Sequence, residues 1–289
     1  MHPLTLLTGL AGLAWLGAKR SYRPLLPTYA GPSERLAGTS ILSSLEAELP
    51  EHQNAVWCAT SDWCRPQAGG ALPGYLTISR PDPARFGLPS DGEITVCSLE
   101  AHLRFAVPFR SANQPLIFRA SGGATRAVNW FGLRAEDRSK YRSIRRQVQI
   151  LWEDDEGFAL DICRFSRPFR VIVAQIPRPS SLGAGVEAVR QRCEQPPRPL
   201  DLCASLAIPA QSWELSQLFA IDASTFRAES IQFRLDRDGC QLASVSLICY
   251  LGRQEYHFDQ PFLLYLETRP DEQPVMVMWV DNAELLAPW

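Results

Sequence analysis

Histidine, the side chain most often used for proton transfer and for binding transition metals, occurs four times, at His2, His52, His102 and His257. The four are scattered and show no metal-ligand spacing. His257 stands beside Phe258, where packing is its expected role. The run Asp236-Arg237-Asp238-Gly239 resembles half of a calcium-binding loop, but no carboxylate follows at the offset such a loop needs. A turn is therefore expected there, and no metal ion or other cofactor is expected.

Motifs of nucleophilic and nucleotide chemistry are missing from the sequence. There is no G-x-S-x-G nucleophile elbow and no phosphate-binding P-loop. Gly183-Ala184-Gly185 begins a dinucleotide-type glycine motif but lacks its third glycine. We therefore do not expect an enzyme.

Eight cysteines could form disulfides or bind metal, and they stand at positions 58, 64, 97, 163, 193, 203, 240 and 249. No two of them form a C-x-x-C pair, which weakens zinc-ribbon and thioredoxin-like interpretations. Most have apolar neighbours, so buried structural thiols are favoured, while disulfides or a metal role stay open as alternatives.

Six basic residues cluster within thirteen positions: Arg134, Arg138, Lys140, Arg142, Arg145 and Arg146. If this stretch is a strand, 138, 140 and 142 share one face. One interpretation is an anion-binding strip made of Arg138, Lys140, Arg142, Arg145 and Arg146, which would bind a polyanion. The favoured alternative is a solvated strand face that pairs with acidic residues such as Glu153–Glu156. The net charge of −2 gives no overall attraction to nucleic acid, and none is expected as a partner.

The 289 residues are 46% hydrophobic and 21% charged, which is typical of a folded globular protein. Leu4–Ala18 carries no charge, but it is shorter than the ~20 apolar residues that a membrane span needs. This segment is a signal, an anchor or a packed helix, and Lys19-Arg20 follows it directly. Membrane contact is expected only through residues 4–18. The protein is exported or membrane-anchored if they act as a signal, and otherwise cytoplasmic.

We expect an apolar N-terminal segment with linker over 1–28 and one domain over 29–289, with a Pro/Gly-rich loop at about 65–92. Strand patterns dominate that domain, at 55–60, 94–107, 116–119, 127–133, 148–152, 158–162, 170–176 and 202–208. Ser180–Cys193 is an amphipathic helix with Ser180 or Ser181 as its N-cap. Leu42–Leu49 predicts a short helix and Trp213–Phe219 a helical turn.

The most informative stretch runs from Ile231 to Val280. Apolar Ile231, Phe233 and Leu235 alternate with polar residues and lead into the Asp238-Gly239 turn. Phe258-Asp259-Gln260-Pro261-Phe262 then precedes two apolar strands near 262–266 and 275–280. This order resembles the C-terminal part of a serpin. Phe105-Ala106-Val107-Pro108-Phe109, the strand at 171–177 with its following helix, and Ser205–Pro209 before Trp213-Glu214-Leu215 extend the resemblance over about residues 94–286.

The resemblance implies an α+β, mostly β fold with serpin-like mixed sheets and few helices. Several N-terminal serpin helices and main-sheet strands are expected to be missing, because residues 65–92 read as loop. It further implies a hinge at Asp238, Gly239 and Cys240. Family spacing places a protease-sensitive bond in Gly252-Arg253-Gln254, where arginine would suit a trypsin-like serine protease.

The residues between the hinge and that bond are unusual for an inserting loop. The resemblance implies small, unbranched residues there, but Leu242 and Val245 are large. Ala243, Val245, Leu247 and Cys249 alternate with Ser244 and Ser246, which is the pattern of a strand already in a sheet. We therefore expect a non-inhibitory protein with a binding or structural role and an unidentified protein partner. Two alternatives stay open: a serine protease inhibitor with its bait near Arg253, and a polyanion-binding module.

Overall fold

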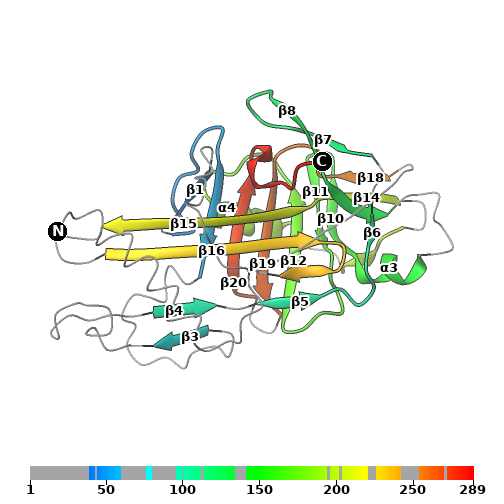
Figure 1. Cartoon of the computed structure of the whole chain (residues 1–289). Coiled ribbons are helices and arrows are strands. Elements are labelled where there is room, and N and C mark those ends of the chain that lie inside the picture. The colour runs from blue at the N-terminus through cyan, green and yellow to red at the C-terminus, as the bar shows by residue number, and fades with distance from the viewer. Residues whose placement is uncertain are drawn as a thin grey trace. The chain divides into compact units, whose positions relative to one another are not determined.

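The structure is a computed structural model that describes residues 39–42, 44–59, 76–79, 96–99, 101–111, 114–133, 141–193, 196–201, 204–220, 226–241, 254–269 and 272–289 (Figure 1). Strands prevail in this part of the chain, and two α-helices accompany them, α3 (Arg142–Gln147) and α4 (Leu182–Gln191). The predicted class, α+β and mostly β with few helices, is confirmed.

The chain divides into two compact units. The smaller comprises residues 1–35, 59–100 and 214–231. Its described strands β3 (Leu76–Ser79) and β4 (Val96–Leu99) pair antiparallel. The larger comprises residues 36–58, 101–213 and 232–289, and it contains the features described below, apart from residues 214–231. That both units belong to the single domain expected over 29–289 stays a prediction.

An eight-stranded sheet forms the centre of the larger unit, in the order β1-β2-β20-β19-β12-β11-β10-β13. The strands are β1 (Thr39–Ile41), β2 (Asn54–Cys58), β10 (Gln149–Asp154), β11 (Gly157–Asp161), β12 (Phe169–Gln175), β13 (Arg198–Pro199), β19 (Phe262–Thr268) and β20 (Pro274–Val280). All seven residues of β19 are buried, which explains why its sequence is nearly continuous in apolar residues. The apolar runs predicted near 55–60, 170–176, 262–266 and 275–280 are confirmed as strands of this sheet.

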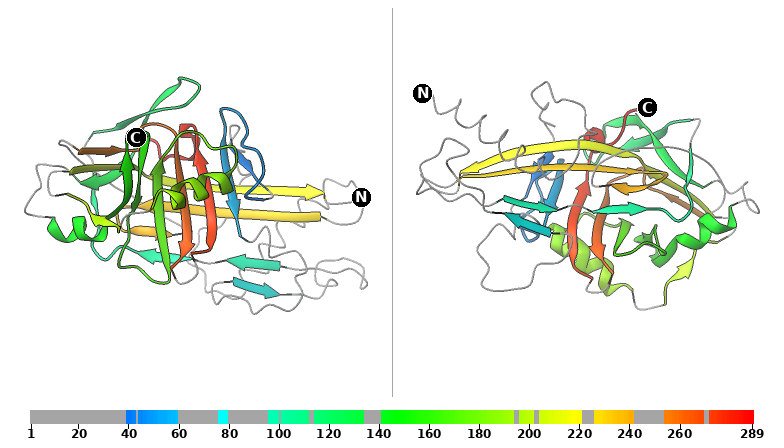
Figure 2. Two further views of the ribbon diagram at one scale, coloured as in Figure 1. Left: turned by 180° about the vertical axis from the view of Figure 1, so that it is seen from behind. Right: turned by 60° about the horizontal axis from the view of Figure 1, so that its bottom comes forward.

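Helix α4 contacts β19 and β20 (Figure 2). The Ser181 side chain is its N-cap and accepts a hydrogen bond of 3.1 Å from the backbone N–H of Ala184. Leu182, Val186 and Val189 form the buried face of the helix. The predicted helix, its cap and its apolar face are therefore confirmed.

Three smaller sheets complete the described part. One has the order β18-β14-β9-β6, with β18 (Gln254–His257), β14 (Ala204–Pro209), β9 (Trp130–Leu133) and β6 (Arg110–Ser111). Another has the order β15-β16-β17-β5, with β15 (Gln211–Ala220), β16 (Phe226–Asp236), β17 (Gly239–Gln241) and β5 (His102–Arg104). β7 (Leu116–Arg119) and β8 (Thr125–Val128) pair antiparallel as a hairpin, in the region of the strands predicted at 116–119 and 127–133. A 3-10 turn, η3 (Ala283–Leu285), lies near the C-terminus.

Several local predictions are wrong. Trp213–Phe219 lies within strand β15, because pairing with β16 outweighs the local helical pattern. Ser44–Leu49 forms a turn and a β-bridge from Glu48 to Ser181 instead of the helix expected over Leu42–Leu49. Instead of the single strand expected over 94–107, the chain forms two short strands, β4 and β5. Glu100, which stands between them in the sequence, lies outside the described residues.

Within the described residues, no helix is long and apolar enough to cross a membrane. The predicted signal, anchor or packed helix at residues 4–18 lies outside the described part. So does the loop predicted at about 65–92, apart from the four residues of β3.

Candidate functional site

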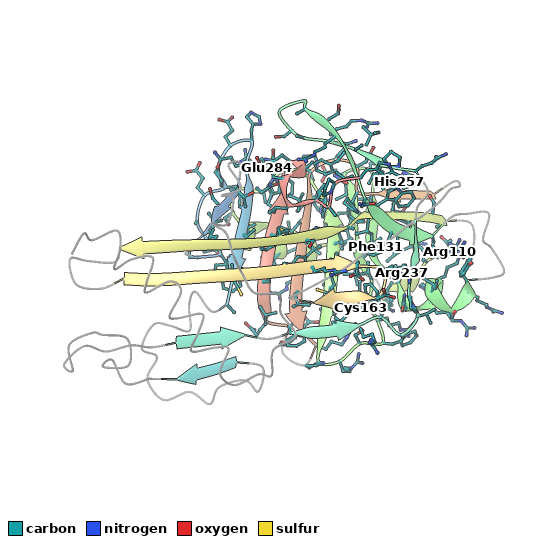
Figure 3. The ribbon with its side chains drawn as sticks, viewed as in Figure 1. Arg110, Phe131, Cys163, Arg237, His257 and Glu284 are labelled. Carbon is teal, nitrogen blue, oxygen red and sulfur yellow. The ribbon has the colours of Figure 1, made fainter. Side chains whose placement is uncertain are left out.

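The candidate site consists of the hinge, Asp238–Cys240, and the strand β18, which bound residues 242–253 on either side. At the hinge, a two-residue turn joins β16 to β17 (Figure 3, where Arg237 is labelled). The carboxylate of Asp236 accepts a hydrogen bond of 2.7 Å from the backbone N–H of Asp238, which closes the turn. The predicted turn is confirmed.

The chain leaving β5 wraps around this turn. The backbone N–H of Phe105 donates to the carbonyl of Asp238 at 2.9 Å, and that of Phe109 donates to the carbonyl of Arg237 at 2.7 Å. The rings of Phe105 and Phe109 lie edge to face, with centroids 4.9 Å apart. The turn is therefore held from outside by two backbone hydrogen bonds and an aromatic pair.

Strand β17 has a hydrogen-bonded neighbour on each side. It pairs antiparallel with β16, with Leu235 opposite Cys240, and antiparallel with β5, with Leu103 opposite Cys240. A Cβ atom on Gly239 would lie 2.2 Å from the carbonyl oxygen of Leu103, closer than any side chain can approach. Glycine at this hinge position therefore permits the close approach of β5, and β17 is an interior strand.

Cys240 faces the core. Its side chain is buried on the same face of the sheet as Leu103, Phe233 and Leu235. Burial raises the pKa of the Cys240 thiol far above its ordinary value, and Asp236 adds to the effect. The thiol is therefore protonated and unreactive at neutral pH, as expected of a structural cysteine. Cys163 is likewise buried, with a raised pKa caused first by burial.

The opposite face of β16 carries a buried ion pair between Arg234 and Asp236, with 3.2 Å between Nε and the carboxylate. Burial lowers the pKa of Arg234 and raises that of Asp236, so desolvation outweighs their mutual attraction. The Nη2 atom of Arg234 has no hydrogen-bond partner among the described residues. This pair makes the end of β16 polar on one face and apolar on the other.

At the other boundary, β18 pairs in parallel with β14 in a register that places Gln254 beside Ala204. The Tyr256 hydroxyl donates to the Glu153 carboxylate at 3.0 Å, and Arg198 binds the same carboxylate. Burial raises the pKa of Tyr256 above its ordinary value, and the negative charge of Glu153 raises it further. The phenol is therefore a stable hydrogen-bond donor near neutral pH.

An aromatic cluster follows directly. Phe258 is fully buried, and its ring centroid lies 5.1 Å from that of Phe158 and 5.4 Å from that of Phe262. Tyr256 also meets Phe158, at 4.9 Å. The Nε2 atom of His257 lies 3.3 Å from the hydroxyl oxygen of Ser205, so His257 has the packing role beside Phe258 that the sequence predicted. Together these contacts fix β18 and the residue after it.

The structure describes some of the predicted site residues and not others. Asp238, Gly239 and Cys240 form the hinge turn and β17, and Gln254 begins β18. Gly252 and Arg253 lie outside the described residues, and so does the strand expected from 242 to 250. Residence of that segment in the sheet and a bait at Arg253 therefore stay predictions.

The predicted anion-binding strip requires a correction. Arg142, Arg145 and Arg146 lie on helix α3 rather than on a strand, and Arg138 and Lys140 lie outside the described residues. Arg145 is buried, and its Nη1 donates to the carbonyls of Asp201 at 2.7 Å and Ala204 at 2.6 Å. It therefore has a structural role, while Arg142 and Arg146 remain exposed.

Sequence reasoning missed the polar anchor of β18. Tyr256, Glu153 and Arg198 are far apart in the chain and belong to no motif, so only the pairing of strands brings them together. Residues that could hold a metal ion do not cluster anywhere in the part of the chain that is described.

The chain matches no protein-family model, and no curated protein is similar to it. Solved structures with a similar fold include thyroxine-binding globulin in complex with thyroxine, at 10% identity and a TM-score of 0.44, over 66% of this chain and 56% of that one. They also include a highly specific serpin of the insect Tenebrio molitor, at 12% identity and a TM-score of 0.43, over 66% of this chain and 56% of that one.

A serpin from the trematode Schistosoma haematobium is similar at 12% identity and a TM-score of 0.45, over 68% of this chain and 59% of that one. Two of these three structures are described as serpins, the family that the sequence is predicted to resemble. The chain spans a little over half the length of these structures. Their names describe serpins and a thyroxine-binding protein, and none describes an enzyme.

Proposed function

We propose that this protein is a non-inhibitory, serpin-like protein with a binding or structural role, and not an enzyme, in which the loop segment after the hinge is resident in the sheet. One observation carries the proposal: residues 242–253 are bounded on both sides by strands that already have hydrogen-bonded neighbours. A protease bait, by contrast, has to be free to enter a protease before cleavage and free to enter the sheet afterwards.

Access to the predicted bait bond is restricted by β18. This strand begins at Gln254, directly after Arg253, and it pairs with β14 from its first residue. Proteins commonly bind an extended peptide by adding it to a sheet edge through its backbone groups. A protease that enclosed both sides of Arg253 would have to accept Gln254 and the following residues while they stay paired with β14, or else separate β18 from β14. The contacts of Tyr256 and Phe258 oppose that separation.

The length of the chain sets a second restriction. From Gln241 to Gln254 there are 254 − 241 = 13 residue steps, which reach at most about 45 Å. In the register of β16 and β17, in which Arg234 is opposite Gln241, a strand that continued to Phe226 would end at Cys249. The strand from Gln241 to Cys249 would be about 26 Å long. It would leave five residue steps, from Cys249 to Gln254, which reach at most about 17 Å.

Those five steps would have to reach Gln254, the first residue of β18. A segment that is resident in the sheet therefore leaves little slack chain around Arg253 for a protease to bind.

The test is digestion of the full chain with trypsin, with Arg253→Ala as the control and mass spectrometry to locate the cut. We expect slow cleavage at Arg253, no denaturant-resistant complex with trypsin, and a melting temperature that changes by only a few degrees. An inhibitor would instead give a covalent complex that Arg253→Ala abolishes. Cleavage that raised the melting temperature by more than about 10 °C would show insertion of a new strand and would overturn the proposal.

A further inference from the structure

The turn between β11 and β12 presents an exposed aromatic ring between two arginines. Phe165 is 54% exposed, one of three large apolar side chains with such exposure among the described residues. Arg164 precedes it, with the guanidinium 5.6 Å from the ring centroid, and Arg167 follows. An exposed phenylalanine alone is unremarkable, so its charged surroundings decide the argument.

Two other elements bring further arginines to this turn. The Ser166 hydroxyl donates to the carbonyl of Arg104 in β5 at 3.2 Å. The backbone N–H of Arg164 donates to the carbonyl of Gln147, the last residue of α3, at 2.8 Å. Both Arg104 and Arg164 have exposed side chains.

Helix α3 adds two basic residues. Arg142 and Arg146 are four residues apart and therefore share one side of the helix, and both are exposed. Ile144 and Arg145 are buried on the other side. We call the exposed set the basic face, and its members are Arg104, Arg142, Arg146, Arg164, Arg167 and Phe165.

Among the described residues, no carboxylate forms an ion pair with the basic face. None of its five arginines forms an ion pair with any residue of the described part, although eight other arginines there do. The nearest acid in the sequence, Asp161, is buried and bound to Arg269 at 3.0 Å. In a chain of net charge −2, five unneutralised arginines on adjoining elements point to an anionic partner.

The turn is also rigidly held. Arg269 donates to the carbonyl of Cys163 at 2.7 Å and to that of Ser166 at 2.8 Å. Arg167 donates to the same Ser166 carbonyl at 2.8 Å. Phe165 is therefore presented in a fixed position, which lowers the entropic cost of binding.

We propose that the basic face binds the surface of a membrane that contains anionic phospholipids. Phe165 enters the boundary between headgroups and acyl chains, and the arginines bind the phosphate and carboxylate groups around it. A soluble polyanion would engage the arginines but leave Phe165 in water, so the lipid surface accounts for both features. This inference does not depend on the proposed function, and it adds a contact to the one that the sequence assigned to residues 4–18 alone.

The test is co-sedimentation of the full chain with vesicles of phosphatidylcholine, with or without phosphatidylserine. We expect binding that requires phosphatidylserine and weakens with salt. Arg142→Ala with Arg146→Ala should weaken it about 25-fold, because each arginine near an anionic surface contributes about fivefold. Phe165→Ala should weaken it about tenfold, through lost apolar burial. Any contribution of residues 4–18 would appear equally on neutral vesicles.

Matched controls are Arg126→Ala and Ile117→Ala, which remove an exposed arginine from β8 and a 47% exposed apolar side chain from β7. Neither should change binding. The proposal fails if neutral vesicles bind as well as anionic ones, or if the double arginine variant binds normally. It also fails if Phe165→Ala has no effect while a sulfated polymer binds the protein as tightly as vesicles do, which would identify a soluble polyanion as the partner.

Discussion

At the hinge, Gly239 and Cys240 are held by backbone hydrogen bonds to strands on both sides, whereas at β18 the side chains of Tyr256 and Phe258 make the additional contacts. The hinge depends on the absence of a side chain, because β5 passes where a Cβ atom of Gly239 would lie. The β18 anchor depends on the presence of particular side chains.

This difference indicates which of the two ends that bound residues 242–253 is more easily detached from its sheet. A backbone contact tolerates no larger residue but is insensitive to pH. An anchor made of aromatic packing and a tyrosine–carboxylate bond can be weakened in small steps, by substitution or by titration. We infer that β18 is the adjustable end of the segment and the hinge is the fixed end. Three substitutions test this comparison.

The largest loss of stability is expected for Phe258→Ala. Removing a fully buried aromatic ring costs about 4 kcal/mol, through lost burial and the cavity left between Phe158 and Phe262. Thermal unfolding should show a melting temperature lower by about 10 °C. Phe165→Ala is the matched control, since that ring is 54% exposed and its loss should change the melting temperature by less than about 2 °C.

Gly239→Val should cost about 3 kcal/mol, because the new side chain meets the Leu103 carbonyl and must displace β17 or β5. Urea unfolding measures the loss, and hydrogen exchange should show faster exchange at Cys240. Gly122→Ala is the control, since a Cβ atom there would make an ordinary contact, 3.9 Å from His52. Equal stability of both variants would show that β17 is not a fixed interior strand.

Tyr256→Phe should have the smallest effect, a loss of about 1.5 kcal/mol at neutral pH from the missing bond to Glu153. The pKa of Tyr256 is raised in the folded protein, so its contribution is complete below about pH 10 and declines as the pH rises toward the higher folded value. The stability difference between the wild type and the variant should therefore narrow above pH 10. A constant difference in that range would exclude the phenol as the donor.

The sequence predicted much of this fold through local patterns. The Ser181 cap of α4 was predicted because short-range geometry determines it. The apolar runs of β19 and β20 were predicted because burial on both faces excludes polar residues. Asp238 and Gly239 were expected to form a turn because an alternating strand stops there, and the serpin resemblance implied that this turn is the hinge.

The errors have a common cause. Trp213–Phe219 has apolar spacing compatible with a helical turn, and pairing with β16 makes it a strand. Arg142, Arg145 and Arg146 were expected on a solvated strand, yet they lie on α3, where Arg145 turns inward to bind two carbonyls. Periodicity over a few residues does not determine which neighbour an element will have.

The sequence by itself therefore determined the β-rich class, the positions of the main strands along the chain and the position of the hinge turn. Each of these depends on residues that are close together in the chain. Only the tertiary structure decided that β17 is an interior strand, that Tyr256 reaches Glu153, and that β5 and α3, with their exposed arginines, adjoin the turn that carries Phe165. These features join residues that are distant in sequence, and such contacts are fixed by the packing of whole elements and not by any local preference.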